Sequence, residues 1–213
     1  MSKGYLNNLF EHVARAWVCL LVVAAVFVCG TCAGAYCVRL ADAEELEELS
    51  SYVSVFVGRL GSADFELSPL VTFYASVAQV LRTIFFVWLL GVTVVGIPAV
   101  WAAVFVRGFA SGFSVAFLAE EMGVGGVVFA ACAILPQSLF LVSGLVLAGT
   151  LATWFSWRIL QQRKAGRKMD FLGEFMGYTS LFAACAALSL LGSLVEGWIT
   201  PLLMKVGSSF IAR

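Results

Sequence analysis

Long uncharged apolar stretches alternate with short polar blocks along the chain, a pattern that predicts helices crossing a lipid bilayer. A helix of about 20 apolar residues spans a hydrocarbon core of about 30 Å. Spans of this kind are predicted at about residues 17–38, 84–106, 108–133, 137–157 and 174–195. Residues 108–157 count as two spans because, at about 1.5 Å per residue, the stretch is long enough for a round trip. The pattern therefore predicts an all-α, polytopic integral membrane protein with five transmembrane helices and one broken helix region, in which residues 1–213 form a single membrane domain.

The polar block at residues 39–83 predicts an amphipathic helix outside the membrane. Asp42 and Glu45 have the spacing of a helix-capping box. Apolar residues then recur at helical spacing until Gly61 ends the run. These positions are Leu46, Leu49, Val53, Phe56, Val57 and Leu60. Ser68 and Pro69 have the pattern that begins the next helix. The apolar stripe either folds onto the outer ends of the chain's own spans or forms a docking surface for proteins outside the membrane.

Composition agrees with a membrane protein and excludes two other classes. Hydrophobic residues make up 62% of the chain and charged residues 12%. A soluble domain is roughly 45–50% apolar and about 25% charged, so this chain has too little charge to cover a surface in water. Its formal net charge of +0 gives no reason to expect a nucleic-acid partner.

Basic residues predict the orientation, because loops rich in Lys and Arg stay in the cytoplasm. The strongest cluster lies in the loop at residues 158–172 and comprises Arg158, Arg163, Lys164, Arg167 and Lys168. Placing this loop in the cytoplasm puts the N-terminus and Arg107 on the same side. Residues 39–83 and a C-terminal helix at residues 198–213 then lie outside the cell, with the C-terminus.

Two carboxylates fall inside an apolar stretch and have two interpretations. Glu120 and Glu121 lie 12 and 13 residues after Gly108, just before Gly123. A charge at the centre of a span costs about 2.5–3.5 kcal/mol or more, so it normally faces protein or water. In the interpretation we favour, the half-helix is short and tilted and both acids reach the outer surface. In the alternative, they line a transport path at mid-membrane, and the protein is a small-molecule or ion transport component.

Glycine pairs four residues apart predict close packing between spans, because small residues let helix backbones approach each other in lipid. Three such pairs occur: Gly30 with Gly34, Gly108 with Gly112, and Gly173 with Gly177. Glu196 ends the last span, where an interfacial position costs little. Thr200 and Pro201 then begin the short outer helix.

The sequence does not contain the combinations of residues that the usual catalytic sites require. The single histidine, His12, precedes the first span, and the three aspartates lie outside the spans. Neither an HExxH nor a GxSxG motif occurs. All six cysteines fall within apolar stretches, where thiols pack between helices. We therefore predict that the protein is not an enzyme and has no cofactor or metal site.

Two segments resemble the stage II sporulation protein M family. Residues 107–118 (RGFASGFSVAFL), followed by EEMG at 120–123 and LPQ at 135–137, are similar to the family's central motif. Residues 195–201 (VEGWITP) are similar to its Glu…Thr-Pro ending. The motif positions are Gly108, Gly112, Glu120, Glu121, Gly123, Pro136, Gln137, Glu196 and Pro201. Many members of the wider family carry histidine after the proline, where this chain has Gln137; this favours the sporulation branch.

The resemblance implies a membrane scaffold for cell-wall (peptidoglycan) hydrolases. Its partners would be stage II sporulation proteins D and P, and its role would be septal thinning and forespore engulfment. It would act in the cell membrane, at the sporulation septum and the engulfing membrane. Membrane lipid is a further expected partner, a homo-oligomer is compatible with the sequence, and nucleic acid is not expected.

Overall fold

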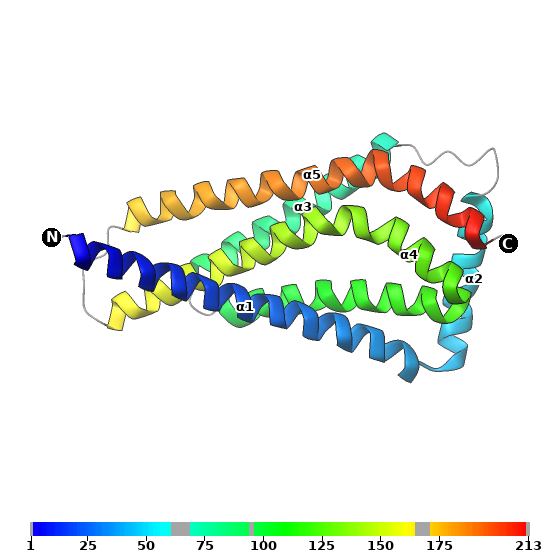
Figure 1. Ribbon diagram of the computed structural model, residues 1–213, viewed down its shortest axis with the longest axis horizontal. Coiled ribbons are helices and arrows are strands. Elements are labelled where there is room, and N and C mark those ends of the chain that lie inside the picture. Colours follow the sequence, from blue (N-terminus) through cyan, green and yellow to red (C-terminus); the bar gives the residue numbers. More distant parts are fainter. Residues whose placement is uncertain (1, 61–68, 94–95, 165–170, 212–213) are drawn as a thin grey trace.

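Helices form every element of the computed structural model that is described, which covers the backbone of residues 2–60, 69–93, 96–164 and 171–211 (Figure 1). In chain order they are α1 (Ser2–Leu40), α2 (Ala43–Leu60), α3 (Pro69–Val92), α4 (Gly96–Lys164) and α5 (Phe171–Ile211). The long helices α1, α3, α4 and α5 run along one axis. The shorter α2 lies across one end, which also holds the C-terminus (Figure 1). We call this end the α2 end, and the opposite end, where the chain starts, the N-terminal end.

α4 crosses the bundle twice because it is broken at Gly123. This glycine has φ 58° and ψ −135°, a backbone conformation that side chains with a Cβ rarely adopt. The first limb of α4 (residues 96–122) runs to the α2 end and the second limb (residues 124–164) returns (Figure 1). Five helical stretches in the described residues are long and apolar enough to cross a membrane: Trp17–Leu40, Leu70–Val92, Gly96–Ile134, Pro136–Gln162 and Leu172–Met204. The all-α membrane fold with five spans and a broken region is confirmed.

The second span differs from the prediction, which made residues 84–106 one helix. α3 crosses as Leu70–Val92 and α4 begins at Gly96, so residues 70–83 belong to a span and not to the outer segment. Pro98 does not kink a span; it lies in the first turn of α4, where the missing N–H of proline costs no helical hydrogen bond. The apolar composition of residues 84–106 concealed the turn. The glycine and threonine residues of this stretch were the only sequence features that indicated a turn.

The turn between α3 and α4 is stabilised by hydrogen bonds from the second limb of α4 and from α5. Ser156 of α4, which is fully buried, donates to the carbonyl of Gly91 at 2.6 Å. Tyr178 of α5 donates to the carbonyl of Trp88 at 2.9 Å. The last carbonyls of a helix have no partner within it, and away from water they need donors from elsewhere. Ser156 supplies such a donor to the Gly91 carbonyl, and Tyr178 adds a contact one residue before the last four carbonyls.

α5 continues through the position where the prediction ended the last span. It runs unbroken from Phe171 to Ile211 with Pro201 inside it, so the separate outer helix at residues 198–213 is wrong. The Thr200 hydroxyl, next to Pro201, donates to the carbonyl of Val195 at 3.3 Å. One face of this segment, with Gly197 and Thr200, is buried against the bundle, and this packing keeps the helix intact across the proline.

α1 packs on the first limb of α4 through the two predicted glycine pairs. A Cβ on Gly30 would lie 2.3 Å from the carbonyl oxygen of Phe105, and one on Gly112 would lie 2.0 Å from that of Thr31. The two backbones are therefore in direct contact, as the spacing predicted. By contrast, a Cβ on Gly177 would meet no atom within 4 Å, so that glycine lies outside any helix interface among the described residues.

Candidate functional site

α2 carries the predicted partner-binding residues, and the structure divides them between two faces. Leu46 and Val53 are partly buried, whereas Leu49 is 37% exposed. Tyr52 and Val55, which the prediction omitted, are 67% and 55% exposed. The side chains of Phe56, Val57 and Leu60 lie outside the described part of the chain. We call Leu49, Tyr52 and Val55 the α2 outer face.

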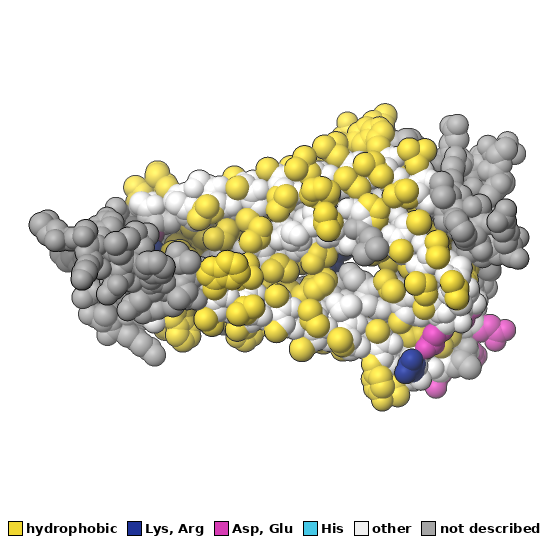
Figure 2. Space-filling model, in the orientation of Figure 1, with side chains coloured by type: hydrophobic (Ala, Val, Ile, Leu, Met, Phe, Trp, Pro, Cys, Tyr) yellow, Lys and Arg dark blue, Asp and Glu magenta, His cyan; other side chains and the backbone are white. Residues whose placement is uncertain are grey.

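Acidic side chains lie at the same end of the molecule as α2. Glu121 accepts a hydrogen bond of 2.7 Å from Ser50 of α2, and Glu120 lies 3.6 Å from Arg39 at the end of α1. Both glutamates are exposed. Figure 2 shows acidic and basic side chains together near the α2 end of this face, with hydrophobic ones over the middle. The interpretation that both acids reach the end of the bundle agrees with the structure.

The start of α4 explains this position. Glu120 lies 24 residues after Gly96, about 36 Å along a helix, which exceeds the thickness of a hydrocarbon core. The sequence prediction began this span at Gly108, which made the limb before Glu120 too short. The transport alternative placed these two glutamates on a path at mid-membrane, and the structure places them at the end of the bundle.

Glu196 is a carboxylate that contacts two other helices. It is partly buried on α5, 24 residues after Leu172 and about 36 Å along that helix, so it lies toward the α2 end, and its interfacial position stays a prediction. Ser76 of α3 donates to Glu196 Oε2 at 2.5 Å, and the Gln137 amide, correctly oriented, donates to the same carboxylate at 3.1 and 3.2 Å. The Ser76 hydroxyl also lies 3.0 Å from that of Ser193. Two family-motif residues, Gln137 and Glu196, thus join α4 to α5, and Ser76 joins both to α3.

Arg107 also lies inside a span, where the prediction placed it in a cytoplasmic loop. It follows Gly96 by 11 residues, about 16 Å along the first limb and near mid-membrane. With Gln79 and Ser189, among others, it lines a cavity of about 30 Å³. The buried Ser189 hydroxyl has no hydrogen-bond partner there, and no described carboxylate forms an ion pair with Arg107. The cavity has room for a water molecule that would serve both groups.

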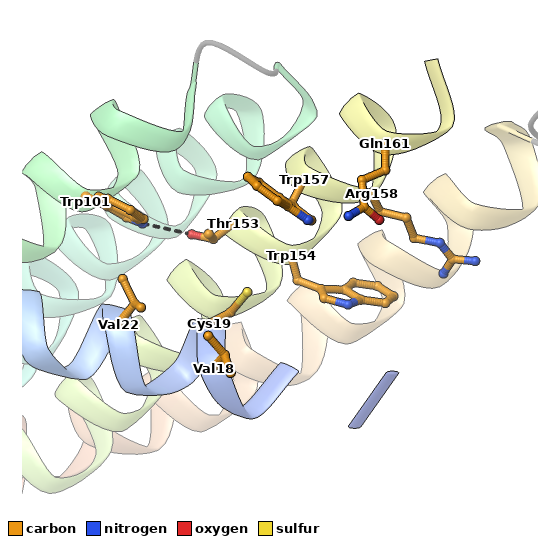
Figure 3. Close-up of a pocket in the computed structure, with 9 residues that line it drawn as sticks. All are labelled: Val18, Cys19, Val22, Trp101, Thr153, Trp154, Trp157, Arg158 and Gln161. Atoms are coloured by element: carbon orange, nitrogen blue, oxygen red, sulfur yellow. Dashed lines mark hydrogen bonds between the residues drawn. The ribbon is translucent and has the colours of Figure 1, made fainter. Parts of the chain in front are cut away.

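A larger groove lies at the N-terminal end, between α1 and both limbs of α4 (Figure 3). Its volume is about 450 Å³. One wall consists of Val18, Cys19 and Val22. The opposite side carries Trp101, Thr153, Trp154, Trp157, Arg158 and Gln161. The indole N–H of Trp101 donates to the Thr153 hydroxyl at 3.2 Å, which fixes one side of the groove.

Arg158 links this groove to α5. Its guanidinium lies 2.9 Å from Glu174 and 5.2 Å from the centre of the Trp154 ring. Gln162 donates to the same carboxylate oxygen of Glu174 at 3.2 Å. Arg158 therefore belongs to a helix and not to the predicted loop at residues 158–172, because α4 continues to Lys164. The backbone of residues 165–170 and the side chains of Arg163 and Lys164 lie outside the described part of the chain.

Sequence reasoning missed several residues that the structure brings together. Ser76 and Ser156 gave no signal, because single serines are common in spans and their partners lie more than 60 residues away in sequence. The groove had a weak signal in Trp154, Trp157 and Arg158, whose spacing of three and four residues places Trp154 beside both others on one helix. In the described residues no group of three or more metal-ligating side chains occurs.

Comparison with known proteins gives one match. The model of the family described as Stage II sporulation protein M matches residues 23–201. This range includes the glycine pairs of α1 and α4 and the break at Gly123. It also includes Ser76, Gln137 and Glu196, which we call the Glu196 cluster. No curated protein and no solved structure matches the chain significantly.

Proposed function

Because the chain belongs to the stage II sporulation protein M family, and so has a role in sporulation, we propose that it is a non-enzymatic membrane scaffold. In this proposal it assembles septal peptidoglycan hydrolases for septal thinning and forespore engulfment. Stage II sporulation proteins D and P are the partners that the family resemblance implies. The observation that supports the proposal best is the α2 outer face, which combines exposed apolar side chains with a neighbouring acidic surface.

The α2 outer face has the composition of a protein-docking surface. Tyr52 is an aromatic side chain with a polar tip, and residues of this kind are enriched at interfaces between proteins. Glu44, Glu47 and Glu48 are exposed on the same helix and would favour a partner with a basic surface. Because α2 lies across the end of the bundle, a partner could reach this face from outside the membrane (Figure 1).

The orientation that this role requires is also a proposal. The basic residues at 163–168 favour placing the N-terminal end in the cytoplasm. The α2 end and the C-terminus would then face the cell wall, at the septum and the engulfing membrane. The hydrolases work on that side.

A double substitution on the α2 outer face tests the scaffold. Tyr52→Ser with Val55→Ser removes two exposed apolar side chains without touching the core. We expect the variant to reach the membrane at normal level but to lose recruitment of both hydrolases to the septum, and engulfment to stop. Fluorescently tagged hydrolases and membrane imaging in a sporulating host provide the measurement.

A matched control uses the opposite end of the molecule. Leu172→Ser with Met176→Ser removes side chains that are 64% and 63% exposed, so it changes the exposed apolar surface by a similar amount. This control should sporulate normally. Normal engulfment in the α2 variant, or equal loss in both variants, would contradict the proposal.

The same assay separates the scaffold from transport through the two acids. Glu120→Gln with Glu121→Gln removes both charges at the α2 end and leaves the Glu196 cluster unchanged. A scaffold that docks through the α2 outer face tolerates this change. Loss of function in this double variant, with hydrolase recruitment intact, would support transport instead.

A further inference from the structure

The groove of Figure 3 has an apolar interior and a polar mouth. Val18 and Val22 of α1 face the ring of Trp101 and the second limb of α4 across it. Arg158 and Gln161 lie at one end, and the Arg158 side chain extends out of the groove toward α5, where it reaches Glu174. A molecule that fills this space needs a hydrophobic chain and a polar group at one end of that chain.

The depth of the groove matches the boundary between acyl chains and headgroups. Val18 lies three residues after Arg15, where the uncharged stretch of α1 begins, and Gln161 lies two residues before Arg163. Tryptophan is enriched at this level of a bilayer because its indole ring is apolar and its N–H is polar. Trp154 and Trp157 both lie within two turns of Gln161. The polar mouth of the groove is therefore at headgroup level.

Charge at the mouth selects a negative headgroup. Arg158 lies at the mouth, and the sequence after it holds four more basic residues up to position 168, against the two acids Asp170 and Glu174. Each cation near a membrane surface contributes about 1 kcal/mol to the attraction of anionic lipid. The side chain of Arg158 is 35% exposed, and its ion pair with Glu174 uses one of the three guanidinium nitrogens. The remaining N–H groups are donors of the kind that bind phosphate.

From these observations we propose that the groove binds one anionic phospholipid. An acyl chain lies against Val18, Val22 and Trp101, and the headgroup phosphate accepts hydrogen bonds from Arg158 at the mouth. The bound lipid holds α1 against the second limb of α4 at the N-terminal end, where the groove separates them. This site is separate from the α2 outer face, so a failure of the lipid proposal would leave the scaffold proposal unaffected, and the reverse also holds.

Native mass spectrometry of the purified full-length chain, released from detergent after incubation with phosphatidylglycerol or phosphatidylcholine, tests the proposal. The unchanged chain should retain one phosphatidylglycerol in preference to phosphatidylcholine. Val22→Phe fills the groove and should weaken retention about tenfold, a loss of about 1.4 kcal/mol. Val106→Phe adds the same ring at a side chain that is 63% exposed and outside the groove, and should retain the lipid.

Substitutions at Arg158 test the headgroup contact separately. Arg158→Gln should abolish the preference for phosphatidylglycerol, while Arg158→Lys should keep most of it. Thermal unfolding in detergent shows whether each variant is folded. If Val22→Phe does not fold, Trp157→Phe provides a milder change in the groove. Equal retention of both lipids by the unchanged chain, full retention by the folded groove variants, or displacement of the lipid by inorganic phosphate would each overturn the proposal.

Discussion

At the scale of single residues, the glycines of α1 and α4 have the clearest structural role. In lipid there is no hydrophobic drive between helices, so close contact between backbones must supply the packing energy. A Cβ on Gly34 would lie 2.1 Å from the carbonyl oxygen of Phe109, which belongs to a backbone that cannot move independently. Any side chain at this position must separate the two helices.

Gly34→Ala should therefore destabilise the protein by about 1–3 kcal/mol, the range typical of overpacking. Thermal unfolding in detergent measures the change. Gly177→Ala is the matched control, because its Cβ would meet open space. Alanine is a better helix former than glycine by up to about 1 kcal/mol, so the control should be neutral or more stable. Equal stability of the two variants would contradict the packing described for α1.

Glu196 is the second residue whose role the structure defines. Glu196→Ala would leave the Gln137 amide without its acceptor, and an unpaired buried polar group costs about 1–3 kcal/mol. The Ser76 hydroxyl would keep Ser193 as an acceptor. Glu120→Ala removes an exposed ion pair and should cost no more than about 1 kcal/mol. The difference in unfolding temperature between the two variants checks this ranking, and a larger loss for Glu120→Ala would reverse it.

At the scale of elements, the sequence predicts helices well where their ends carry polar signals. The acidic start of α2, its end before Gly61 and the start of α3 at Pro69 all agree with the structure. The turn between α3 and α4 could not be predicted in the same way. Its stability comes from Ser156 and Tyr178, which lie far along the chain and meet α3 only after folding.

Ser156→Ala tests this account of the turn. The carbonyls of Gly91 and Thr93 would each lose a hydrogen bond from Ser156, and we expect a loss of about 1–3 kcal/mol in unfolding free energy. The control is Ser143→Ala, because Ser143 is exposed and its hydroxyl bonds only to its own helix, at Leu139. If both substitutions cost the same, the turn does not depend on Ser156.

Whether a candidate site residue was predicted also depended on whether the sequence near it carried a polar signal. Glu120 and Glu121 were visible as charges in an apolar stretch, but their depth depended on where α4 begins. Placing that start at Gly96 moves them to the end of the bundle and moves Arg107 into it. The missed turn therefore misplaced Arg107, while the favoured position of Glu120 and Glu121 and the number of five spans both agree with the structure.

At the scale of the whole molecule, the two ends have different surfaces. The α2 end carries the α2 outer face and the acids Glu120 and Glu121. The N-terminal end carries the tryptophan groove and leads into the basic residues at 163–168. Along the chain, one span separates the α1 side of the groove from α2, and three spans separate α2 from the α4 side. A partner bound at one end and a lipid bound at the other would therefore lie on opposite sides of the membrane.

The side of the membrane that α2 occupies is the central claim of the scaffold proposal. Ser51→Cys places a thiol on α2 at an exposed position, and Leu172→Cys places one at the opposite end, where the leucine is 64% exposed. The unchanged chain, with its native cysteines, gives the background. A membrane-impermeant maleimide added to intact cells should label Ser51→Cys, and should label Leu172→Cys only after the cells are broken. Labelling of Ser51→Cys solely in broken cells would place α2 in the cytoplasm and contradict the account.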